Sequence, residues 1–512
     1  MARGMRRAGE AAEAMATYSP AEELFNRRRQ TVGLIAAPIA FVVLLAIPSS
    51  LPPAAHRLGA VLVTMVVLWV TEAVPLSVTA LVGPVVAVLL GVAPARAVLA
   101  PFADPIIFLF IGSFMLAEAM FVHELDRRIA YTALGSRLVH GGGGGRIILV
   151  YGGVCALLSM WLSNTATTAM MFPIGLSIAA RLTSGHPKPA DARRFAMIVM
   201  LVTAFSASIG GLGTPIGTPP NLIGLAMLDR LAGYRISFIG WMTFAVPLMV
   251  ATMAFMLLYF YFGPLRGVEI ATADRALLRD ELRRLGPVSR GQRNVMIAFG
   301  ITVVLWLVPG IFAIIGGTDW APARAFNARV PESIAALVGA ALLFVLPVDW
   351  RARRFTLSWE EAVQIDWGVI LLFGGGLAMG ELAFSTGLAP AMGDALMNWF
   401  PAHGALALTL AFTGLSILLT EVTSNTAAAN IIVPIAIASA RAAGTDPVGP
   451  ALGATLGASL AFMLPVSTPP NAIVYSSGHV PITSMVRYGI ILDVAGFVFV
   501  VLMVRLAAGW LF

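Results

Sequence analysis

The sequence predicts an all-helical, polytopic membrane protein, and three observations lead to this fold class. First, of the 512 residues 58% are hydrophobic and only 12% are charged, and the mean hydropathy is +0.87. A soluble domain carries about 25% charged residues, so this chain cannot cover a globule of its size in water. Second, apolar runs of about 20 residues, the length of a membrane-spanning helix, recur along the chain. Third, several of these runs occur twice in the same order, which indicates an internal duplication.

Two kinds of apolar run are present, continuous runs and interrupted ones. The continuous runs are 31–50, 57–75, 78–96, 104–122, 236–263, 293–316, 332–348, 366–384 and 484–511. The interrupted runs, each broken near its middle by polar or Pro-rich sequence, are 147–181, 194–228, 403–440 and 450–478. We therefore predict about 11 transmembrane helices and two re-entrant helical hairpins.

The interrupted runs carry the duplicated motifs. The matching pairs are Ser163-Asn164-Thr165 with Ser424-Asn425-Thr426, Thr218-Pro219-Pro220-Asn221 with Thr468-Pro469-Pro470-Asn471, and the upstream segments 106–118 and 369–381. Any one of these motifs alone is explained by a kinked helix or by hydroxyl groups that bond to helix carbonyls. Their recurrence in one order, at the interruptions of long apolar runs, favours a functional site.

Flanking charges predict how the two halves lie in the bilayer. Arg and Lys residues lie on both sides of the first Ser-Asn-Thr motif, whereas the second is flanked only by His403 and Arg441. Because cytoplasmic connections are rich in Arg and Lys, we expect the two hairpins to enter from opposite sides, as inverted-topology repeats. The N-terminus is then inside and the C-terminus outside. No apolar core precedes Arg27-Arg28-Arg29, so we expect no cleaved signal peptide.

Several other function classes fit the sequence poorly. The net charge of +7 comes from Lys and Arg in short connections, which is the pattern of topology determinants rather than of nucleic-acid contact. The six histidines lie near span ends without ligand spacing, which argues against an intramembrane hydrolase or a zinc site. We expect no enzyme activity, no organic cofactor and no nucleic-acid partner. A channel stays open as an alternative, which saturable transport kinetics would exclude.

The motifs have a chemistry that suits cations and anions together. Adjacent prolines remove two backbone donors and break each helix, which leaves carbonyl oxygens near Gly217 and Ser467 in need of a partner. Hard cations such as Na⁺ accept carbonyl oxygens, completed by Ser, Thr and Asn side chains. Each Ser-Asn-Thr motif lies where a helix begins, and the exposed N–H groups there attract anions. No Lys or Arg lies close to these motifs, so a dianion needs bound cations to balance its charge.

Other polar residues in the apolar runs have two interpretations each. Glu421 adjoins the second hairpin tip, where it either binds a proton or cation or orients the tip through hydrogen bonds. Asp493, in the last span, is expected to be a buried structural acid rather than a coupling group. Asp104 and Asp366 precede apolar spans and are predicted to cap helix N-termini. Asn430 is expected to bond between helices.

At its two Ser-Asn-Thr and two Thr-Pro-Pro-Asn motifs the sequence resembles the divalent anion/sodium symporter family, over roughly residues 30 to 511. This family includes di- and tricarboxylate transporters and sulfate transporters. The resemblance implies a homodimer in which a mobile transport domain moves against a scaffold domain as an elevator. It divides the chain into the cytoplasmic segment 1–30, scaffold helices 31–135 and 293–390, transport-domain segments 146–263 and 403–512, and the cytoplasmic connector 264–292.

The resemblance also implies two sodium sites and a substrate site. Sodium site 1 comprises Ser159, Ser163, Asn164 and Gly217, and sodium site 2 comprises Thr420, Thr423, Asn425 and Ser467. The substrate residues are Asn164, Thr165, Thr218, Ser424, Asn425, Thr426, Thr468 and Pro469. Thr423 and Ser467 stand where small, alanine-like residues are common, and both are expected to act through backbone carbonyls.

These features together predict a secondary-active symporter of the cytoplasmic (inner) membrane. It would move C4-dicarboxylates such as succinate, malate or fumarate with sodium ions. The alternatives within the same fold are a sodium-independent dicarboxylate exchanger and a carrier of sulfate or tricarboxylates.

Overall fold

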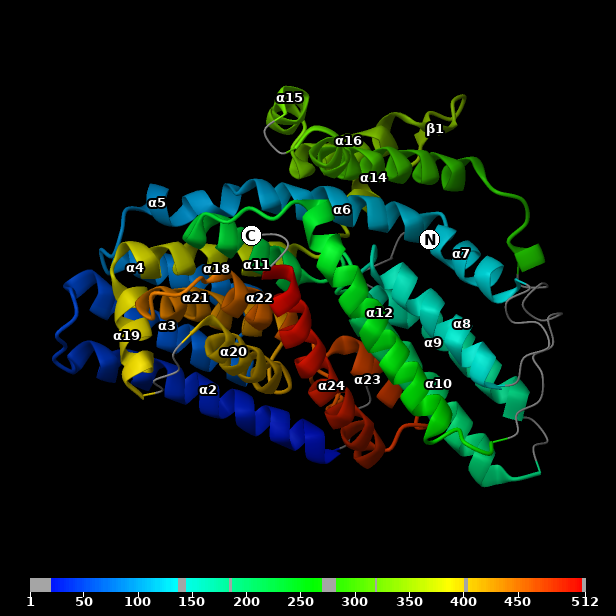
Figure 1. Ribbon diagram of the computed structural model, residues 1–512, viewed down its shortest axis with the longest axis horizontal. Helices are drawn as coiled ribbons and strands as arrows, with labels where there is room; N and C mark the ends of the chain where they lie inside the picture. Colours follow the sequence, from blue (N-terminus) through cyan, green and yellow to red (C-terminus); the bar gives the residue numbers. More distant parts are fainter. Residues whose placement is uncertain are drawn as a thin grey trace.

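The computed structural model describes residues 20–136, 144–183, 187–268, 282–317, 320–399 and 404–508, and these are mostly helical (Figure 1). The predicted helical fold class is thereby confirmed. The described part also contains one antiparallel strand pair that the all-α prediction lacked, β1 (Pro347–Asp349) and β2 (Arg354–Phe355). The strands pair because Asp349 closes the turn between them, where its carboxylate accepts the N–H groups of Arg351 and Ala352. Most of the expected N-terminal segment and cytoplasmic connector, residues 1–19 and 269–281, lies outside the described residues.

The long apolar helices lie close to the predicted spans. They are α2 (Pro20–Ala46), α3 (Pro53–Thr71), α4 (Leu76–Leu89), α6 (Pro105–Val122), α12 (Phe238–Phe262), α14 (Arg290–Gly316), α16 (Glu332–Val345), α18 (Trp367–Ser385) and α24 (Ile482–Ala508). In the described ranges, eight helices are long and apolar enough to cross a membrane, or nine if the bent pair of α15 (Ala321–Arg329) and α16 is one span. α4 is shorter than the predicted run 78–96 because Gly91, with a φ of +68°, turns the chain. The total of about 11 spans stays a prediction.

Each interrupted run forms two helices separated by a short non-helical stretch. The pairs are α8 (Gly144–Ser159) with α9 (Asn164–Thr183), α10 (Pro189–Gly210) with α11 (Pro219–Met227), α20 (Ala405–Thr420) with α21 (Asn425–Ala442), and α22 (Val448–Gly457) with α23 (Pro469–Tyr475). The second helix of each pair begins within the predicted motif. Pro at the first position of α11 and α23 favours this start, because the first N–H groups of a helix have no partner within the helix.

The two repeats interlock rather than stand side by side. α10 packs on α8 and α9, and α22 packs on α20 and α21, so each hairpin covers the broken helix of its own repeat. The short helices cross over: α23 packs against α9 and α10, while α11 packs against α21 and α22. Both motifs of one repeat are thus held against helices of the other repeat.

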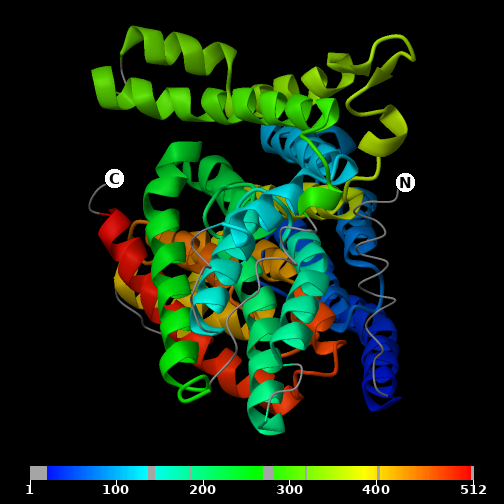
Figure 2. The same ribbon diagram turned by 90° about the vertical axis from the view of Figure 1, so that its right-hand side faces the viewer.

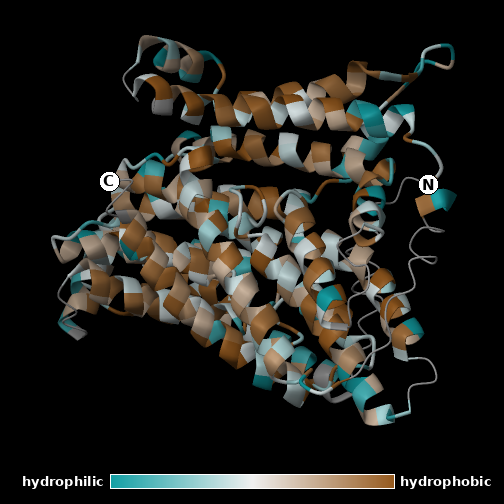
Figure 3. Ribbon diagram, turned by 45° about the vertical axis from the view of Figure 1, so that its right-hand side comes forward, coloured by the Kyte–Doolittle hydropathy of each residue, from teal (hydrophilic) through white to brown (hydrophobic). Residues whose placement is uncertain are grey.

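The remaining elements connect and cover this bundle. They are α5 (Ala95–Leu99), the 3₁₀ turn η1 (Ala100–Ala103), α7 (Leu125–Leu134), the π-helical turn η3 (Leu228–Ala232), α17 (Trp359–Ala362) and α19 (Leu388–Trp399). α14, α15 and α16 form a separate layer that rests on α6, as Figure 2 shows at the top. Hydrophobic residues dominate most of the helices (Figure 3), and large apolar side chains such as Val42, Val304 and Leu506 are exposed. Such exposure suits a lipid-facing surface.

Candidate functional site

The first hairpin tip joins the end of α8 to the start of α9. The hydroxyl of Ser159 donates a hydrogen bond of 2.7 Å to Oδ1 of Asn164. Ser163 caps α9, and its Oγ accepts the N–H of Ala166 at 3.2 Å. The break after α10 lies directly against this tip, because a Cβ added to Gly211 would come within 2.4 Å of Asn164 Oδ1. The oxygens of Ser159 and Asn164 therefore converge on the first helix break.

The second hairpin tip, between α20 and α21, repeats this geometry. The hydroxyl of Thr420 is 2.7 Å from Oδ1 of Asn425, and it is also 2.8 Å from the carbonyl oxygen of Ala458 in the second break. Ser424 caps α21, and its Oγ accepts the N–H of Ala427 at 3.1 Å. Two hydroxyl–asparagine pairs thus occupy equivalent positions in the two repeats.

Each helix break is held by the asparagine that ends the Thr-Pro-Pro-Asn motif. Nδ2 of Asn221 donates to the carbonyl oxygens of Gly211 at 2.9 Å and Thr214 at 2.8 Å. The equivalent bonds in the second repeat run from Asn471 Nδ2 to Ala461 O at 3.1 Å and Leu464 O at 3.0 Å. Both side chains are fully buried. The predicted site residues did not include these asparagines, although their place in a duplicated motif was the signal that marked them.

The predicted substrate residues lie at four helix starts. Asn164 and Thr165 begin α9, Thr218 precedes α11, Ser424, Asn425 and Thr426 lie at the start of α21, and Thr468 and Pro469 lie at the start of α23. Asn164, Thr165, Ser424 and Asn425 are half-buried, whereas Thr218, Thr426 and Thr468 are buried. N–H groups at helix starts favour anionic ligands. All of these residues are uncharged, so the N–H groups and hydroxyls are the anion-binding groups that they offer.

Glu421 follows α20 and turns its carboxylate into the second break. Oε1 accepts the N–H groups of Phe462 at 2.8 Å and Met463 at 2.9 Å. Oε2 accepts the N–H of Leu464 at 3.2 Å and the hydroxyl of Ser467 at 2.6 Å. Of the two interpretations of this residue, the hydrogen bonds favour the one in which it orients the tip and the break.

The capping predictions are confirmed. Asp104 accepts the N–H of Ile106 at 2.9 Å, and Asp366 accepts the N–H of Val369 at 3.1 Å. Nδ2 of Asn430 bonds to Thr426 O on its own helix at 3.0 Å and, more weakly, to Leu372 O of α18 at 3.5 Å, as expected for a contact between helices.

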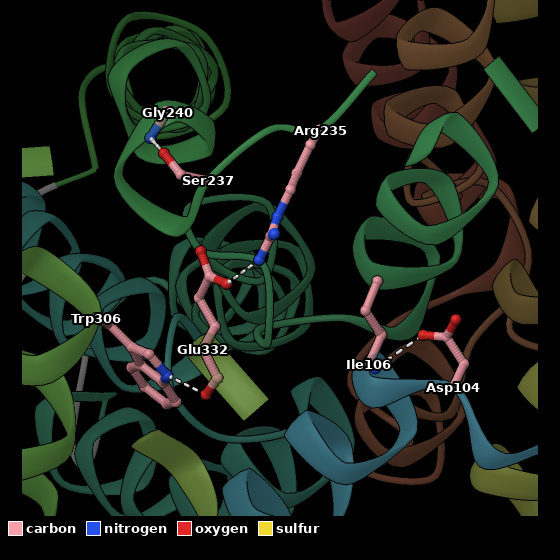
Figure 4. A network of polar contacts seen from close by, with 7 residues as sticks. All are labelled: Asp104, Ile106, Arg235, Ser237, Gly240, Trp306 and Glu332. Carbon is pink, nitrogen blue, oxygen red and sulfur yellow. Dashed lines mark hydrogen bonds and ion pairs between the residues drawn. The ribbon is translucent and has the colours of Figure 1, made fainter. Parts of the chain in front are cut away.

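Two arginines between α11 and α12 pair with acidic residues of other helices. Arg230 lies 2.7 Å from the buried carboxylate of Asp104 at the start of α6. Arg235 lies 3.3 Å from Glu332 at the start of α16, beside the cap formed by Ser237 (Figure 4). The segment 228–237 is therefore tied to α6 and α16 by charge.

Hydroxyl and carbonyl oxygens are the donors that alkali cations prefer, and the paired tips supply them on both sides of the pseudo-symmetric site. The sequence matches the family model described as the sodium:sulfate symporter transmembrane region over residues 28–512. The chain belongs to this family. It is the divalent anion/sodium symporter family that the motifs indicated. The protein is accordingly a multi-pass membrane transporter and not an enzyme.

Similar proteins match this family member over most of its length. The sodium-dependent dicarboxylate transporter SdcS of Staphylococcus saprophyticus is 33% identical, over 93% of this chain and 91% of its own length. SdcS of Staphylococcus aureus strain USA300 is 32% identical, over 93% and 90%. A protein of Haemophilus influenzae named only as an uncharacterized transporter is 35% identical, over 88% and 91%.

Two solved structures resemble the transporter in fold. The YdaH transporter of Alcanivorax borkumensis has a TM-score of 0.50 at 14% identity, with 79% of this chain and 85% of that chain covered. MtrF of Neisseria gonorrhoeae, described as illuminating a class of antimetabolite efflux pumps, has a TM-score of 0.51 at 13% identity, with 90% and 97% covered. At these identities the likeness concerns the fold alone.

Proposed function

We propose that this transporter is a secondary-active symporter that moves C4-dicarboxylates such as succinate, malate and fumarate with sodium ions across the cytoplasmic membrane. The observation that carries the proposal is the duplicated site of two hairpin tips and two helix breaks, which has no Lys or Arg close to its motifs. Each helix start supplies only about half a positive charge. A dianion therefore requires bound cations for charge balance, and this requirement couples the two solutes. The names of the SdcS relatives support the same substrates and the same ion.

The residues divide into two cation sites and one anion site between them. Sodium site 1 would use Ser159, Ser163, Asn164 and Gly217, and sodium site 2 would use Thr420, Thr423, Asn425 and Ser467. The substrate carboxylates would bind Asn164, Thr165, Thr218, Ser424, Asn425, Thr426, Thr468 and Pro469. The 2.7 Å contacts of Ser159 with Asn164 and of Thr420 with Asn425 support this division, because they bring two oxygens of each cation site together.

The movement would be that of an elevator within a homodimer. Segments 146–263 and 403–512 would form the transport domain, and segments 31–135 and 293–390 the scaffold, with the N-terminus inside and the C-terminus outside. Two contacts lie where the proposed transport domain meets the proposed scaffold. Thr423 Oγ1 donates to Trp69 O at 3.2 Å. Trp161 of the first tip packs edge-on against Phe299, with the ring centroids 5.3 Å apart. The domain would move only when it is empty or fully loaded.

A sulfate or tricarboxylate carrier is the second candidate, favoured by the family description, which names sulfate. Sulfate would use the same helix starts. Competition between unlabelled sulfate and labelled succinate separates the two substrates. A dicarboxylate exchanger without sodium is the third candidate, and stimulation of uptake by internal dicarboxylate identifies it.

The test is uptake of radiolabelled succinate into proteoliposomes with and without an inward sodium gradient. Asn164→Ala and Asn425→Ala each remove groups proposed to bind both a cation and a carboxylate. Hydrogen bonds to charged groups contribute about 1.5–3 kcal/mol, so we expect each variant to lose about tenfold or more of the sodium-driven rate.

Thr183→Ala is the matched control, because this residue lies at the end of α9 and its hydroxyl bonds to Ala179 O of its own helix, at 2.8 Å. Its uptake should equal that of the wild type. Uptake that ignores sodium would contradict symport, and normal uptake by both asparagine variants would contradict the proposed site.

A further inference from the structure

The two hairpin tips have the same backbone but differ in one side chain. The residue after the hydroxyl of each tip is Met160 in the first repeat and Glu421 in the second. In both repeats its carbonyl oxygen accepts a hydroxyl from the break of the same repeat: that of Thr214 bonds to Met160 O, and that of Ser467 bonds to Glu421 O at 3.0 Å. The two carbonyl oxygens thus accept hydroxyls in both repeats, although the donors differ in place: Thr214 is equivalent to Leu464, and Ser467 is equivalent to Gly217.

The carboxylate replaces bonds that the first repeat makes within its own backbone. In the first break the N–H of Leu212 bonds to Ile209 O at 3.2 Å, and that of Gly213 bonds to Gly210 O at 3.0 Å. Phe462 and Met463, the equivalent residues of the second break, give their N–H groups to Glu421 Oε1 instead. Hydrogen bonds to a carboxylate favour its ionised form. The Glu421 carboxylate accepts four such bonds, from three backbone N–H groups and one hydroxyl.

Within the central parts of the four interrupted runs, Glu421 is the only charged side chain. In the first repeat, 147–180 and 195–228 contain no Asp, Glu, Lys, Arg or His, and in the second, 405–440 and 448–478 contain only Glu421. The carboxyl of Asp493 on α24 lies beside that of Glu421. The other charged or titratable residues on the helices around this pair, α12, α20, α22 and α24, lie toward the ends of α12 and α24: Tyr259, Tyr261, Arg487, Tyr488 and Arg505.

We propose that Glu421 makes the two repeat-related cation sites unequal, so that the second site fills at a lower sodium concentration than the first. This inference rests on the proposed symport. Glu421 is a positioning residue rather than a ligand: it adjoins Thr420, and its carboxylate is 2.6 Å from the hydroxyl of Ser467, so its charge lies close to the second site. The first site has Met160 at this place and depends on the incoming dianion for its negative charge. Sodium then binds at the second site before the dicarboxylate binds, and sodium binds at the first site together with the dicarboxylate.

The size of the effect follows from Coulomb attraction. At an effective dielectric constant of about 20, a unit negative charge within about 10 Å favours a cation by more than tenfold, which corresponds to about 1.4 kcal/mol. Neutralising Glu421 should therefore raise the sodium concentration that half-fills the second site by about tenfold or more. A role limited to holding the break would lower thermal stability equally in all salts and would not move this concentration.

The experiment follows thermal stability of the purified full-length protein against NaCl, with choline chloride replacing it at constant ionic strength, and measures sodium activation of succinate uptake in parallel. In the wild type, the rise in thermal stability at low sodium concentration reports filling of the second site. For Glu421→Gln we expect the sodium concentration at the midpoint of this rise to increase about tenfold. The succinate KM at saturating sodium should change less. For Met160→Glu, which leaves the second site intact, we expect activation of uptake at lower sodium. Glu360→Gln, a neutralised carboxylate on the surface helix α17, should behave as the wild type.

The outcomes separate the two proposals. If sodium neither stabilises the wild type nor drives its uptake, the symport proposal fails. If sodium stabilises the wild type and Glu421→Gln at the same concentrations, symport stands and the inequality of the sites is overturned. If Glu421→Gln does not fold, Met160→Glu decides the question, since an unchanged sodium dependence in that variant contradicts the inference.

Discussion

At the scale of single residues, the helix breaks depend on asparagine side chains that donate hydrogen bonds to backbone carbonyl oxygens, as backbone N–H groups do within a helix. Within a bilayer no water satisfies the carbonyl groups that an interrupted helix leaves free. Asn221 and Asn471 each use both N–H bonds of the side-chain amide on two carbonyl oxygens of the adjacent break. The fourth residue of the Thr-Pro-Pro-Asn motif thus fixes the shape of the break. The first three residues begin the next helix, with Thr at the N-cap and Pro at the first two positions, whereas the preceding helices end earlier, at Gly210 and Gly457.

Glycine matters at this scale where the first break touches the first tip. Gly211 has helical backbone angles, so alanine fits the backbone, but its Cβ would lie 2.4 Å from Oδ1 of Asn164. Overpacking in a close-packed site costs about 1–3 kcal/mol, and here the displaced group is the proposed ligand itself. We expect Gly211→Ala to lower sodium-driven succinate uptake about tenfold or more, while the protein still inserts and purifies as a folded species.

Gly153→Ala provides the control for this prediction. Gly153 lies on α8 of the same hairpin, and a Cβ there meets no atom within 4 Å. Alanine is the better helix former, so this variant should keep its uptake and gain slightly in thermal stability. Equal uptake by the Gly211 and Gly153 variants would show that Asn164 tolerates displacement and is not a ligand.

At the scale of elements, the sequence predicted the features that local chemistry decides. The helix starts at Ser-Asn-Thr and Thr-Pro-Pro-Asn follow from capping side chains and from Pro at the first helical positions, and so do the caps at Asp104 and Asp366. The preceding helices end before the prolines, at Gly210 and Gly457, so the prolines do not break them as expected. The bonds from Glu421 to Phe462 and from Thr423 to Trp69 join residues distant in sequence. Nothing in one sequence indicates which distant backbone groups a side chain will meet, so the partners of Glu421 needed the structure.

The short helix α7 was not predicted, because ten residues are too few to give an apolar run. Its Asp126 is buried, and this burial raises the pKa of the carboxyl to about 7. The folded state therefore holds a proton that the unfolded chain, with an ordinary value near 4, releases. The contribution of Asp126 to stability is complete below pH 4 and is lost as the pH rises through about 7.

Asp126→Asn tests this pH dependence. Asn has nearly the shape of Asp but does not ionise. At pH 8 the variant should therefore be more stable than the wild type, by about 4 kcal/mol at most. The gain is smaller if α7 opens locally. At pH 5 the difference from the wild type should be much smaller. Thermal unfolding in detergent from pH 5 to pH 8 measures both values. A variant that gains equally at the two pH values would show that Asp126 does not titrate in this range.

At the scale of the whole molecule, the interlocked repeats hold each motif pair against helices of the other repeat, since α23 packs on α9 of the first hairpin and α11 on α21 of the second. The same arrangement leaves a border with α6, α14 and α16, where charged and aromatic contacts gather. Phe238, at the start of α12, stacks on Trp306 of α14 with a ring distance of 4.6 Å. An elevator movement would have to break contacts of this kind, whereas the contacts within the interlocked bundle would persist.

The ion pair of Arg235 with Glu332 allows this movement to be stopped and restarted. The two residues belong to the proposed transport domain and scaffold, and Arg235 is 62% exposed. In Arg235→Cys/Glu332→Cys, a short reducible bis-thiosulfonate reagent should join the two thiols and abolish succinate uptake, and a reductant should restore it. Each single-cysteine variant treated in the same way should keep its uptake, because the native Cys155 is buried. Full transport by the cross-linked protein would mean that the segment 228–237 and α16 move as one body, and the border between the domains would then have to lie elsewhere.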